Sequence, residues 1–397
     1  MGLFSKGKKG QTVALIDIGS ASVGGAYAYY IKDAQPVIYY TVRADIGLRE
    51  GESITDSMLR SLEFVKRHMT TEGAPLLRRE TGSGSVDKVL VAIAAPWQET
   101  RVTNTHIEES RPFTFTHAHV DTATRAVEVP EDRVTLGHTI VATILNGYQV
   151  PTPFGKRASR AEIVLLASSM EKAAAERIES SLRQAFHTHT IELIGFAPAA
   201  YTVFRDLYPH QDDFILLDVT GKGTDLLFVK HGIIKHVASV PQGTHDLLQT
   251  AKVSWRKQHE EEAGPLTKSV NVLFKEETHA IEKEWIEHLH TILQEFSLTD
   301  ALPHAIFLLS DTRTRDYLKR TLEMSTLRAL WLSDKPLAII PVTPSHLCMS
   351  LKTRGISDSD LFLGILALYS GKKSIHIYPA LEAKKPESSM VVSMAPE

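Results

Sequence analysis

The sequence has little cysteine, little net charge and no long apolar run, so it lacks the features that mark disulfide-rich, nucleic-acid-binding or membrane-spanning proteins. One cysteine, Cys348, is present among 397 residues, which excludes an intrachain disulfide and is typical of a reducing compartment. The 44 basic and 47 acidic residues leave a net charge of −3, so the overall charge gives no indication of nucleic-acid binding. The last strongly apolar run, residues 360–369, is about ten residues long and too short to span a bilayer.

Metal-binding and targeting patterns are also missing. The 18 histidines include no closely spaced pair with a third ligand nearby, so a zinc site is not predicted. Residues 1–10 carry lysines but are followed by no long apolar segment, which favours a flexible leader over a signal peptide. The C-terminal residues 380–397 have the composition of a disordered tail, without a basic amphipathic helix for membrane binding.

Two stretches of the chain repeat one unusual pattern. Residues 214–217 form an apolar run ending on Asp218, a turn rich in glycine and threonine follows, and residues 226–229 form a second run. Near the N-terminus, residues 13–16 end on Asp17 and lead into a turn rich in glycine and serine. Each copy predicts a β-hairpin, and the pair indicates internal duplication. Facing each other, two such turns would surround a nucleotide's phosphates, with one aspartate each to hold a cation through water.

The hairpins and the segments between them resemble the actin-like ATPases, most closely their FtsA/PilM branch. Besides the hairpins, the resemblance is carried by Asn146-Gly147-Tyr148, Pro153-Phe154-Gly155-Lys156, residues 161–169 and residues 194–200. It extends over roughly residues 11–250 and implies an α/β chain with the two-lobed, ribonuclease H-like fold of that superfamily and an inserted subdomain of the SHS2 type. Motifs of this kind are more specific for fold than for function.

The resemblance also implies how the chain is divided. The expected segments are the leader (1–10), the first lobe (11–86 and 169–210), the inserted subdomain (87–168), the second lobe (211–379) and the tail (380–397). Local periodicity, caps and turn residues predict the elements within them. These are helices at 54–69 with Thr55 as N-cap, 114–128, 170–186, 247–257, 276–296 and 360–369, strands at 89–95, 138–145 and 305–309, and a loop at 70–86.

The resemblance assigns candidate site residues to the two turns. In the first turn, Asp17, Gly19 and Ser20 match the phosphate loop of the family. In the second, the matching residues are Asp218, Gly221, Thr224 and Asp225. The implied ligands are ATP and Mg²⁺, with Asp17 and Asp218 orienting the metal through water and Asp225 as the catalytic carboxylate. Lys222 is a further candidate, as a cation facing the phosphates.

Four positions depart from the family pattern and predict weak nucleotide binding with slow or absent hydrolysis. Thr220 and Lys222 stand where the family has glycines, so side chains occupy space that a phosphate would approach. Ser310-Asp311 stands where the family has a Gly-Gly turn against the adenosine. No glycine at all occurs between Gly264 and Gly355.

The sequence leaves two classes of function open. The first is an FtsA/PilM-like assembly protein, cytoplasmic and peripheral to the inner membrane, that links a cell-division or type IV pilus machine to it. Its expected partner is an FtsZ-like or a PilN-like protein, with self-assembly as a further possibility and no nucleic acid. The second class is a working ATPase or sugar-kinase-like enzyme of the same fold, here at most a slow ATPase. The segment 87–168 favours assembly, because the family uses this insert for contacts between subunits.

Overall fold

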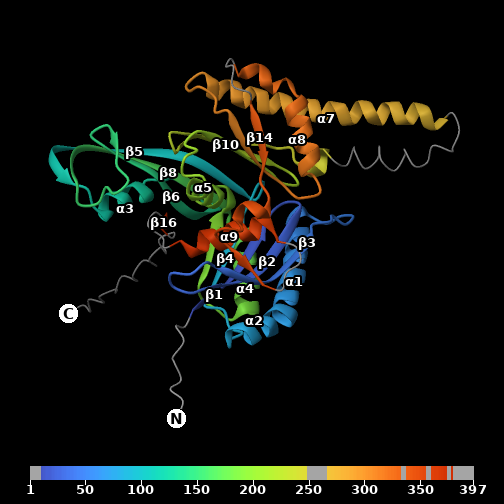
Figure 1. The fold of residues 1–397 in the computed structure, drawn as a ribbon, viewed down its shortest axis with the longest axis horizontal. Coiled ribbons are helices and arrows are strands. Elements are labelled where there is room, and N and C mark those ends of the chain that lie inside the picture. The colour runs from blue at the N-terminus through green and yellow to red at the C-terminus, as the bar shows by residue number, and fades with distance from the viewer. Residues whose placement is uncertain (1–9, 248–265, 332–336, 355–358, 373–376, 379–397) are drawn as a thin grey trace, which may run out of the picture.

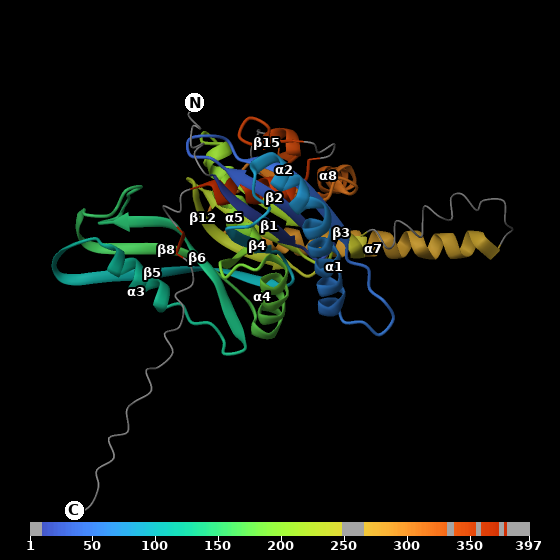
Figure 2. The same ribbon diagram turned by 90° about the horizontal axis from the view of Figure 1, so that it is seen from below.

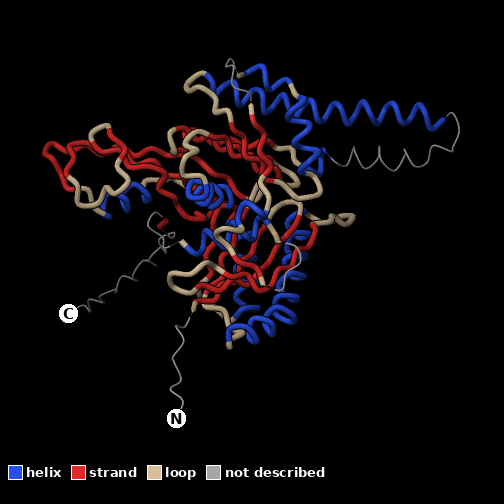
Figure 3. The backbone as a smooth tube through the Cα atoms, in the orientation of Figure 1, coloured by secondary structure: helices blue, strands red, loops and turns tan. Residues whose placement is uncertain are grey.

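Three β-sheets organise the fold (Figure 1). The computed structural model describes residues 10–247, 266–331, 337–354, 359–372 and 377–378, with the side chains of residues 266–279 and 377–378 outside the description. Two of the sheets form the cores of two lobes, and the third forms an extension on one side, as the backbone trace coloured by secondary structure makes clear (Figure 3).

The first lobe is built on a six-stranded sheet with the order β15-β3-β2-β1-β4-β9. Its strands are β1 (Gln11–Ile18), β2 (Ser22–Tyr30), β3 (Val37–Asp45), β4 (Lys88–Ile93), β9 (Ile191–Gly195) and β15 (Lys352–Thr353). β1 and β2 form an antiparallel hairpin, and β4 adds to the other side of β1 in parallel. β1 is buried over nearly its whole length, since packing covers both faces of the sheet, and this explains its continuous apolar run.

The second lobe repeats this topology. Its five-stranded sheet has the order β12-β11-β10-β13-β14. The strands are β10 (Phe214–Val219), β11 (Thr224–Lys230), β12 (Ile233–Val240), β13 (Ala305–Leu309) and β14 (Ala338–Pro341). Here too, the first two strands form an antiparallel hairpin, the third continues antiparallel, and the fourth and fifth add in parallel on the other side of the first. The repeated strand order confirms the internal duplication that the two hairpins indicate.

Helices pack on both faces of the two lobe sheets (Figure 2). They are α1 (Ile54–His68), α2 (Ala74–Thr81), α4 (Lys172–Phe186), α5 (Phe196–Leu207), α7 (Leu266–Ser297), α8 (Arg315–Met324) and α9 (Leu361–Gly371). α1 and α4 share a core with one face of the first sheet, and α7 and α8 share a core with one face of the second. α5 and α9 belong to a central core that takes in strands of both lobes, so the lobes are packed together through these two helices.

The third sheet, with the order β16-β6-β8-β5, projects from the first lobe. Its elements are β5 (Gln98–Thr114), α3 (His117–Arg125), β6 (Arg133–Leu145), β7 (Tyr148–Gln149), β8 (Arg157–Glu171) and β16 (Ile377–Tyr378). A small apolar core that includes Phe115, Val120, Ile163 and Leu165 joins α3 to this sheet. We call this part the insert.

Several local predictions need correction. Ser53, rather than Thr55, is the N-cap of α1, because its hydroxyl accepts the Asp56 N–H at 3.1 Å. Residues 70–86, expected as a loop, are largely helical: a π-helical turn (Met69–Gly73) continues α1 into α2. The buried Leu77 holds α2 in the first-lobe core. α2 ends at Thr81 with Gly82 as its C-cap, so the Gly/Ser-rich end of the segment lies outside the helix, as the loop prediction has it.

The boundary of the insert also differs from the expectation. Residues 88–93 form β4, which pairs with β1 and β9 in the first-lobe sheet, so the insert begins near Gln98 rather than at residue 87. The helix expected from 276 starts at Leu266, and the strand predicted at 305–309 is confirmed. Most of the helix predicted at 247–257, the leader up to residue 9 and the tail from 379 lie outside the described residues.

Candidate functional site

The turns of the two hairpins meet at the boundary between the lobes. The hydroxyl oxygens of Ser20 and Thr220 are 2.9 Å apart, and the Lys222 N–H donates to Ser20 Oγ at 2.8 Å. Gly221 lies so close to the first turn that a Cβ at this position would be 2.7 Å from the backbone nitrogen of Ala21. Only glycine permits this approach. The two turns therefore face each other, as the sequence predicts, but they are joined by direct contacts.

The first backbone N–H group of each turn has an acceptor within the same turn. The Gly19 N–H donates to the Ser22 carbonyl at 3.1 Å, and the Thr220 N–H donates to the Gly223 carbonyl at 2.9 Å. Turns of this kind bind phosphate through N–H groups that point into the ligand site. In the arrangement seen here, these N–H groups close their own turns.

Asp17 is held by an arginine that the sequence analysis did not single out. Asp17, Gly24 and Arg43 lie in one row across β1, β2 and β3. Arg43 Nη2 donates to Asp17 Oδ2 at 2.8 Å, and Arg43 Nε donates to Asp360 Oδ2 at 2.6 Å. A Cβ at position 24 would be 2.5 Å from Arg43 Nη2, so the absent side chain of Gly24 is what lets the guanidinium reach across β2.

Charge and burial act in opposite directions within this ion-paired group. Burial raises the pKa of Asp17, whose exposed fraction is 3%, and the Arg43 guanidinium only partly offsets this. Burial lowers the pKa of Arg43, but Asp360 and Asp17 outweigh it and raise the pKa well above its ordinary value. Arg43 thus stays protonated and supplies a fixed positive charge beside Asp17.

Asp218 has a different environment. It is 1% exposed, and neither of its carboxylate oxygens has a hydrogen-bond partner among the described residues. Burial, followed by the negative charges of Asp225 and Asp17, raises the pKa of Asp218 well above its ordinary value. A buried polar group without a partner is costly, and such groups cluster at functional sites. Asp218 is therefore the strongest sign of function in the cleft between the lobes.

Asp225 lies directly opposite Asp218 in the β10–β11 ladder. Ser239 Oγ donates to Asp225 Oδ1 at 2.7 Å, and Gln98 Nε2 donates to Asp225 Oδ2 at 3.2 Å. Burial raises the pKa of Asp225 to about 6, against the lowering effect of these two hydrogen bonds. Because Gln98 is the first residue of β5, the Asp225 carboxylate connects the second lobe to the insert.

The remaining matched residues of the second turn have structural partners. Lys222 Nζ pairs with Asp246 Oδ1 at 2.8 Å, so its charge is directed to its own lobe. Thr224 Oγ1 donates to the Gln242 carbonyl at 2.8 Å, and the indole N–H of Trp285 donates to Thr224 Oγ1 at 3.1 Å. These bonds tie β11 to the segment after β12 and to α7.

Ser310 and Asp311 line a small pocket between the lobes, together with Arg43 and Asp360, with a volume of about 290 Å³. Ser310 is buried and its hydroxyl has no partner within the described structure. Asp311 accepts from Arg313 Nε at 3.0 Å. Ser310 and Asp311, which stand where the family has two glycines, therefore both have side chains there, and the Asp311 side chain is in an ion pair.

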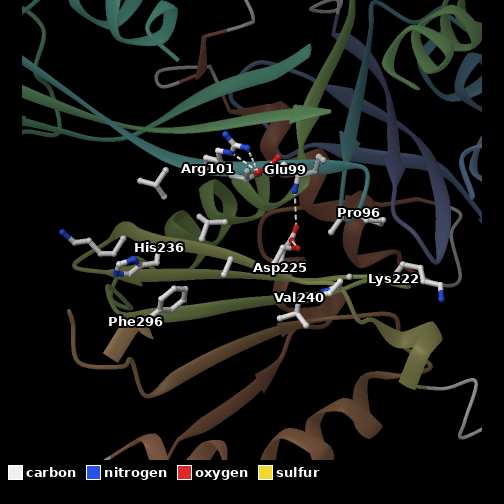
Figure 4. Close-up of a pocket in the computed structure, with 18 of the residues that line it drawn as sticks. Pro96, Glu99, Arg101, Lys222, Asp225, His236, Val240 and Phe296 are labelled. Carbon is white, nitrogen blue, oxygen red and sulfur yellow. Dashed lines mark hydrogen bonds and ion pairs between the residues drawn. The ribbon is translucent and has the colours of Figure 1, made fainter. Parts of the chain in front are cut away.

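A larger groove lies between the insert and the second lobe, with a volume of about 960 Å³ (Figure 4). β5 forms one wall and β12 the other, and the Asp225 carboxylate lies between them, where its bond to Gln98 is drawn. Arg101 and Glu99 are on the β5 wall, and His236 is on the β12 wall. Sequence reasoning missed this groove, because β5 and β12 are far apart in the chain and no motif marks them.

The described residues do not fit a nucleotide as they are arranged. The N–H groups of Gly19, Thr220 and Lys222 have acceptors within the protein. The turns touch, and Arg43 pairs with Asp17 where a hydrated cation would be expected. The described part of the chain holds no group of three or more His, Cys, Asp or Glu side chains placed to bind a metal ion. The assignments of Asp17 and Asp218 to Mg²⁺ stay predictions.

Comparison with known proteins gives a match only at the level of structure. No protein-family model matches the chain, and no curated protein sequence matches it. A chain of the PilM-PilN type IV pilus biogenesis complex aligns with 90% of this chain and 96% of its own length, at a TM-score of 0.54 and 13% identity. The chain has the two-lobed fold of the actin-like ATPases. At this identity the likeness concerns fold alone.

Two other solved structures align over most of the chain at lower scores. One is a Bacteroides thetaiotaomicron protein of unknown function with an actin-like ATPase fold, at 9% identity, covering 94% of this chain and 100% of that one, with a TM-score of 0.44. The other is the ethanolamine utilization protein EutJ from Carboxydothermus hydrogenoformans, at 13% identity, covering 90% and 89%, with a TM-score of 0.41. Alignments at these scores carry no argument about this protein.

No helix within the described residues is both long and apolar enough to cross a membrane.

Proposed function

We propose that this protein is an assembly protein of the FtsA/PilM type, in a PilM-like role, with weak or lost nucleotide binding. It would lie on the cytoplasmic side of the inner membrane, peripheral to it, and connect a type IV pilus machine to the membrane through a PilN-like partner. The alignment with a chain of the PilM-PilN complex supports this role over a cell-division role with an FtsZ-like partner. The insert supports it too, as a surface separate from the lobes.

The observation that carries the proposal is the closed contact between the two turns. Ser20, Thr220 and Lys222 bond to one another across the lobes, and Arg43 neutralises Asp17. Opening the cleft for a triphosphate would break the hydrogen bonds between the turns, at a cost of about 1 kcal/mol each. These contacts hold the lobes together without a bound ligand. A protein whose lobes are fixed in this way can present one constant surface to its partners, as an assembly protein does.

Three measurements test the proposal. Calorimetric titration of the full-length protein with ATP, with and without Mg²⁺, should give weak or no binding, and sedimentation should give no nucleotide-dependent polymers. Co-purification with the PilN-like protein of the same organism should succeed without added nucleotide. Tight Mg²⁺-dependent ATP binding, or co-purification with an FtsZ-like protein and not with a PilN-like one, would contradict the proposal.

A slow ATPase is the second candidate, because Asp218 favours it. Its two unpartnered oxygens are what a hydrated cation would bond, and Asp225 beside it has a pKa of about 6, suited to proton transfer. Phosphate release above that of an Asp218→Asn variant would support this candidate. Equal rates for the two proteins would exclude it.

A further inference from the structure

The insert sheet has one edge that the chain itself covers and one that it leaves open. The strand order is β16-β6-β8-β5. β16, from the C-terminal part of the chain, pairs with Thr139 and His138 of β6 and so covers part of one edge. β5 pairs with β8 alone and forms the other edge. A long open edge presents a row of N–H and C=O groups that another strand can pair with.

β5 is well suited to such pairing. Its register with β8 is continuous from Gln98 to Glu108, and the first shift comes only between Glu108 and Phe113. The part of the edge near Gln98 lines the groove of about 960 Å³. A regular edge that borders a groove of this size, rather than open solvent, can bind an extended segment with side chains held on both faces.

The opposite wall is built differently. In β12, His236 pairs with Phe228 and Ile234 pairs with Val229, so Lys235 is the extra residue of a β-bulge. Bulges interrupt pairing at sheet edges and redirect side chains. Lys235 is exposed, lines the groove, and has no ion-pair partner among the described residues. β12 therefore does not offer a regular edge of its own but contributes a positive charge opposite β5.

The charges of the groove are unbalanced toward the positive. The charged side chains that line it are Glu99, Arg101, Arg133, Lys222, Asp225 and Lys235. Asp225 is bound by hydrogen bonds from Gln98 and Ser239. Glu99 lies 2.7 Å from Arg101 and 3.9 Å from Arg133, so this one carboxylate offsets only one of the two guanidinium charges. Lys222 is offset by Asp246, whereas Lys235 has no such partner among the described residues. This leaves the groove complementary to carboxylates, while Val102, Ala238 and Phe296 supply apolar surface.

We propose that β5 binds an extended, acidic peptide segment of a partner protein as an added strand, in the groove against β12. Backbone hydrogen bonds to β5 supply affinity, Lys235 and Arg101 select aspartate or glutamate, and the apolar surface takes alternate side chains. This inference goes beyond the proposed function and does not depend on the cleft between the lobes.

The first test is selection on the full-length protein from a phage-displayed library of random ten-residue peptides. The selected peptides should alternate β-branched or aromatic residues with Asp or Glu. The double variant Arg101→Glu/Lys235→Glu should lose these peptides and select basic ones. The matched control is Arg79→Glu/Lys283→Glu, which makes the same change in charge at side chains that are 72% and 77% exposed and lie outside the groove. It should select as the unaltered protein does.

The second test measures the best selected peptide by fluorescence anisotropy. The groove variant should weaken binding by about tenfold or more and the control by less than about twofold. N-methylation of the peptide at alternate residues should abolish binding for one set and spare it for the other, since only alternate N–H groups of an added strand face β5.

The proposal is overturned if no peptide is selected, if neutral or basic peptides are selected, or if the groove variant binds as the control does. It is also overturned if N-methylation of both sets is tolerated. Dimerisation that the groove variant abolishes, with no peptide binding, would instead assign the β5 edge to a second copy of the chain.

Discussion

Replacing Asp225 by asparagine should stabilise the protein at neutral pH. The carboxylate is 5% exposed, and burial raises its pKa from 3.8 to about 6. Asparagine has the same shape, its amide oxygen can accept from Gln98, and its amide nitrogen can donate to the Ser239 hydroxyl. The substitution therefore removes a buried negative charge while keeping both neighbours bonded.

The magnitude follows from the shift in pKa. The folded protein holds this proton more tightly than the unfolded chain does, because the folded-state pKa is raised. The stability that the protonated group contributes is therefore fully present below the unfolded pKa of 3.8. It is lost as pH rises through the folded-state pKa of about 6. At about pH 7.5 the loss is about 3 kcal/mol, and at about pH 4.5 it is about 1 kcal/mol. The variant should exceed the unaltered protein in unfolding free energy by these amounts.

Urea unfolding followed by circular dichroism between about pH 4.5 and 7.5 measures this difference. Asp213→Asn is the matched control. Burial raises the pKa of Asp213, but hydrogen bonds from Lys230 and the His231 N–H outweigh it and lower the pKa overall. That variant should be less stable at neutral pH, with a deficit that shrinks as pH falls. A stabilisation by Asp225→Asn that is absent at neutral pH, or that does not change with pH, would refute the reasoning.

Three further substitutions probe the boundary between the lobes. Arg43→Ala leaves Asp17 and Asp360 without their cation and should cost about 3–5 kcal/mol in urea unfolding. Gly24→Ala places a Cβ 2.5 Å from Arg43 Nη2 and should also destabilise the protein. The loss should be smaller than for Arg43→Ala, because the guanidinium can shift. An equal or larger loss would show that the backbone is displaced instead of the guanidinium. Asp218→Asn should raise the melting temperature at neutral pH and not in acid, since burial raises the pKa of this group; a fall at neutral pH would show a missing partner for the carboxylate.

The sequence predicts the parts of this fold that depend on local pattern. Apolar runs ending on Asp17 and Asp218 locate the two hairpins, and their repetition predicts a duplicated sheet, which the strand order confirms. Residues 70–86 are predicted as a loop because Gly and Ser dominate their end, whereas the part up to Thr81 is helical and is held by the burial of Leu77. Long-range contacts of this kind leave no local pattern to read.

The same distinction applies to the candidate site. Ser20, Gly221 and Lys222 come together because the hairpins that carry them are recognisable. Arg43 was missed, although it occupies the row of Asp17 and Gly24, since finding it requires the register of β2 and β3 with its bulge between Tyr27 and Ala28. Gln98 was missed for a similar reason: its partner Asp225 is 127 positions away in the chain.

The departures from the family pattern have a structural explanation in the contacts that they make. Thr220, which stands where the family has glycine, uses its hydroxyl to contact Ser20 Oγ at 2.9 Å and to donate to the Ala95 carbonyl at 3.1 Å. Both contacts cross from the second lobe to the first, and a glycine could make neither. The residue that is expected to obstruct phosphate binding thus also joins the lobes. These contacts favour a cleft whose residues hold the lobes together over a nucleotide site that has only lost its glycines. Loss of a glycine alone would leave the new threonine side chain without such hydrogen-bond partners.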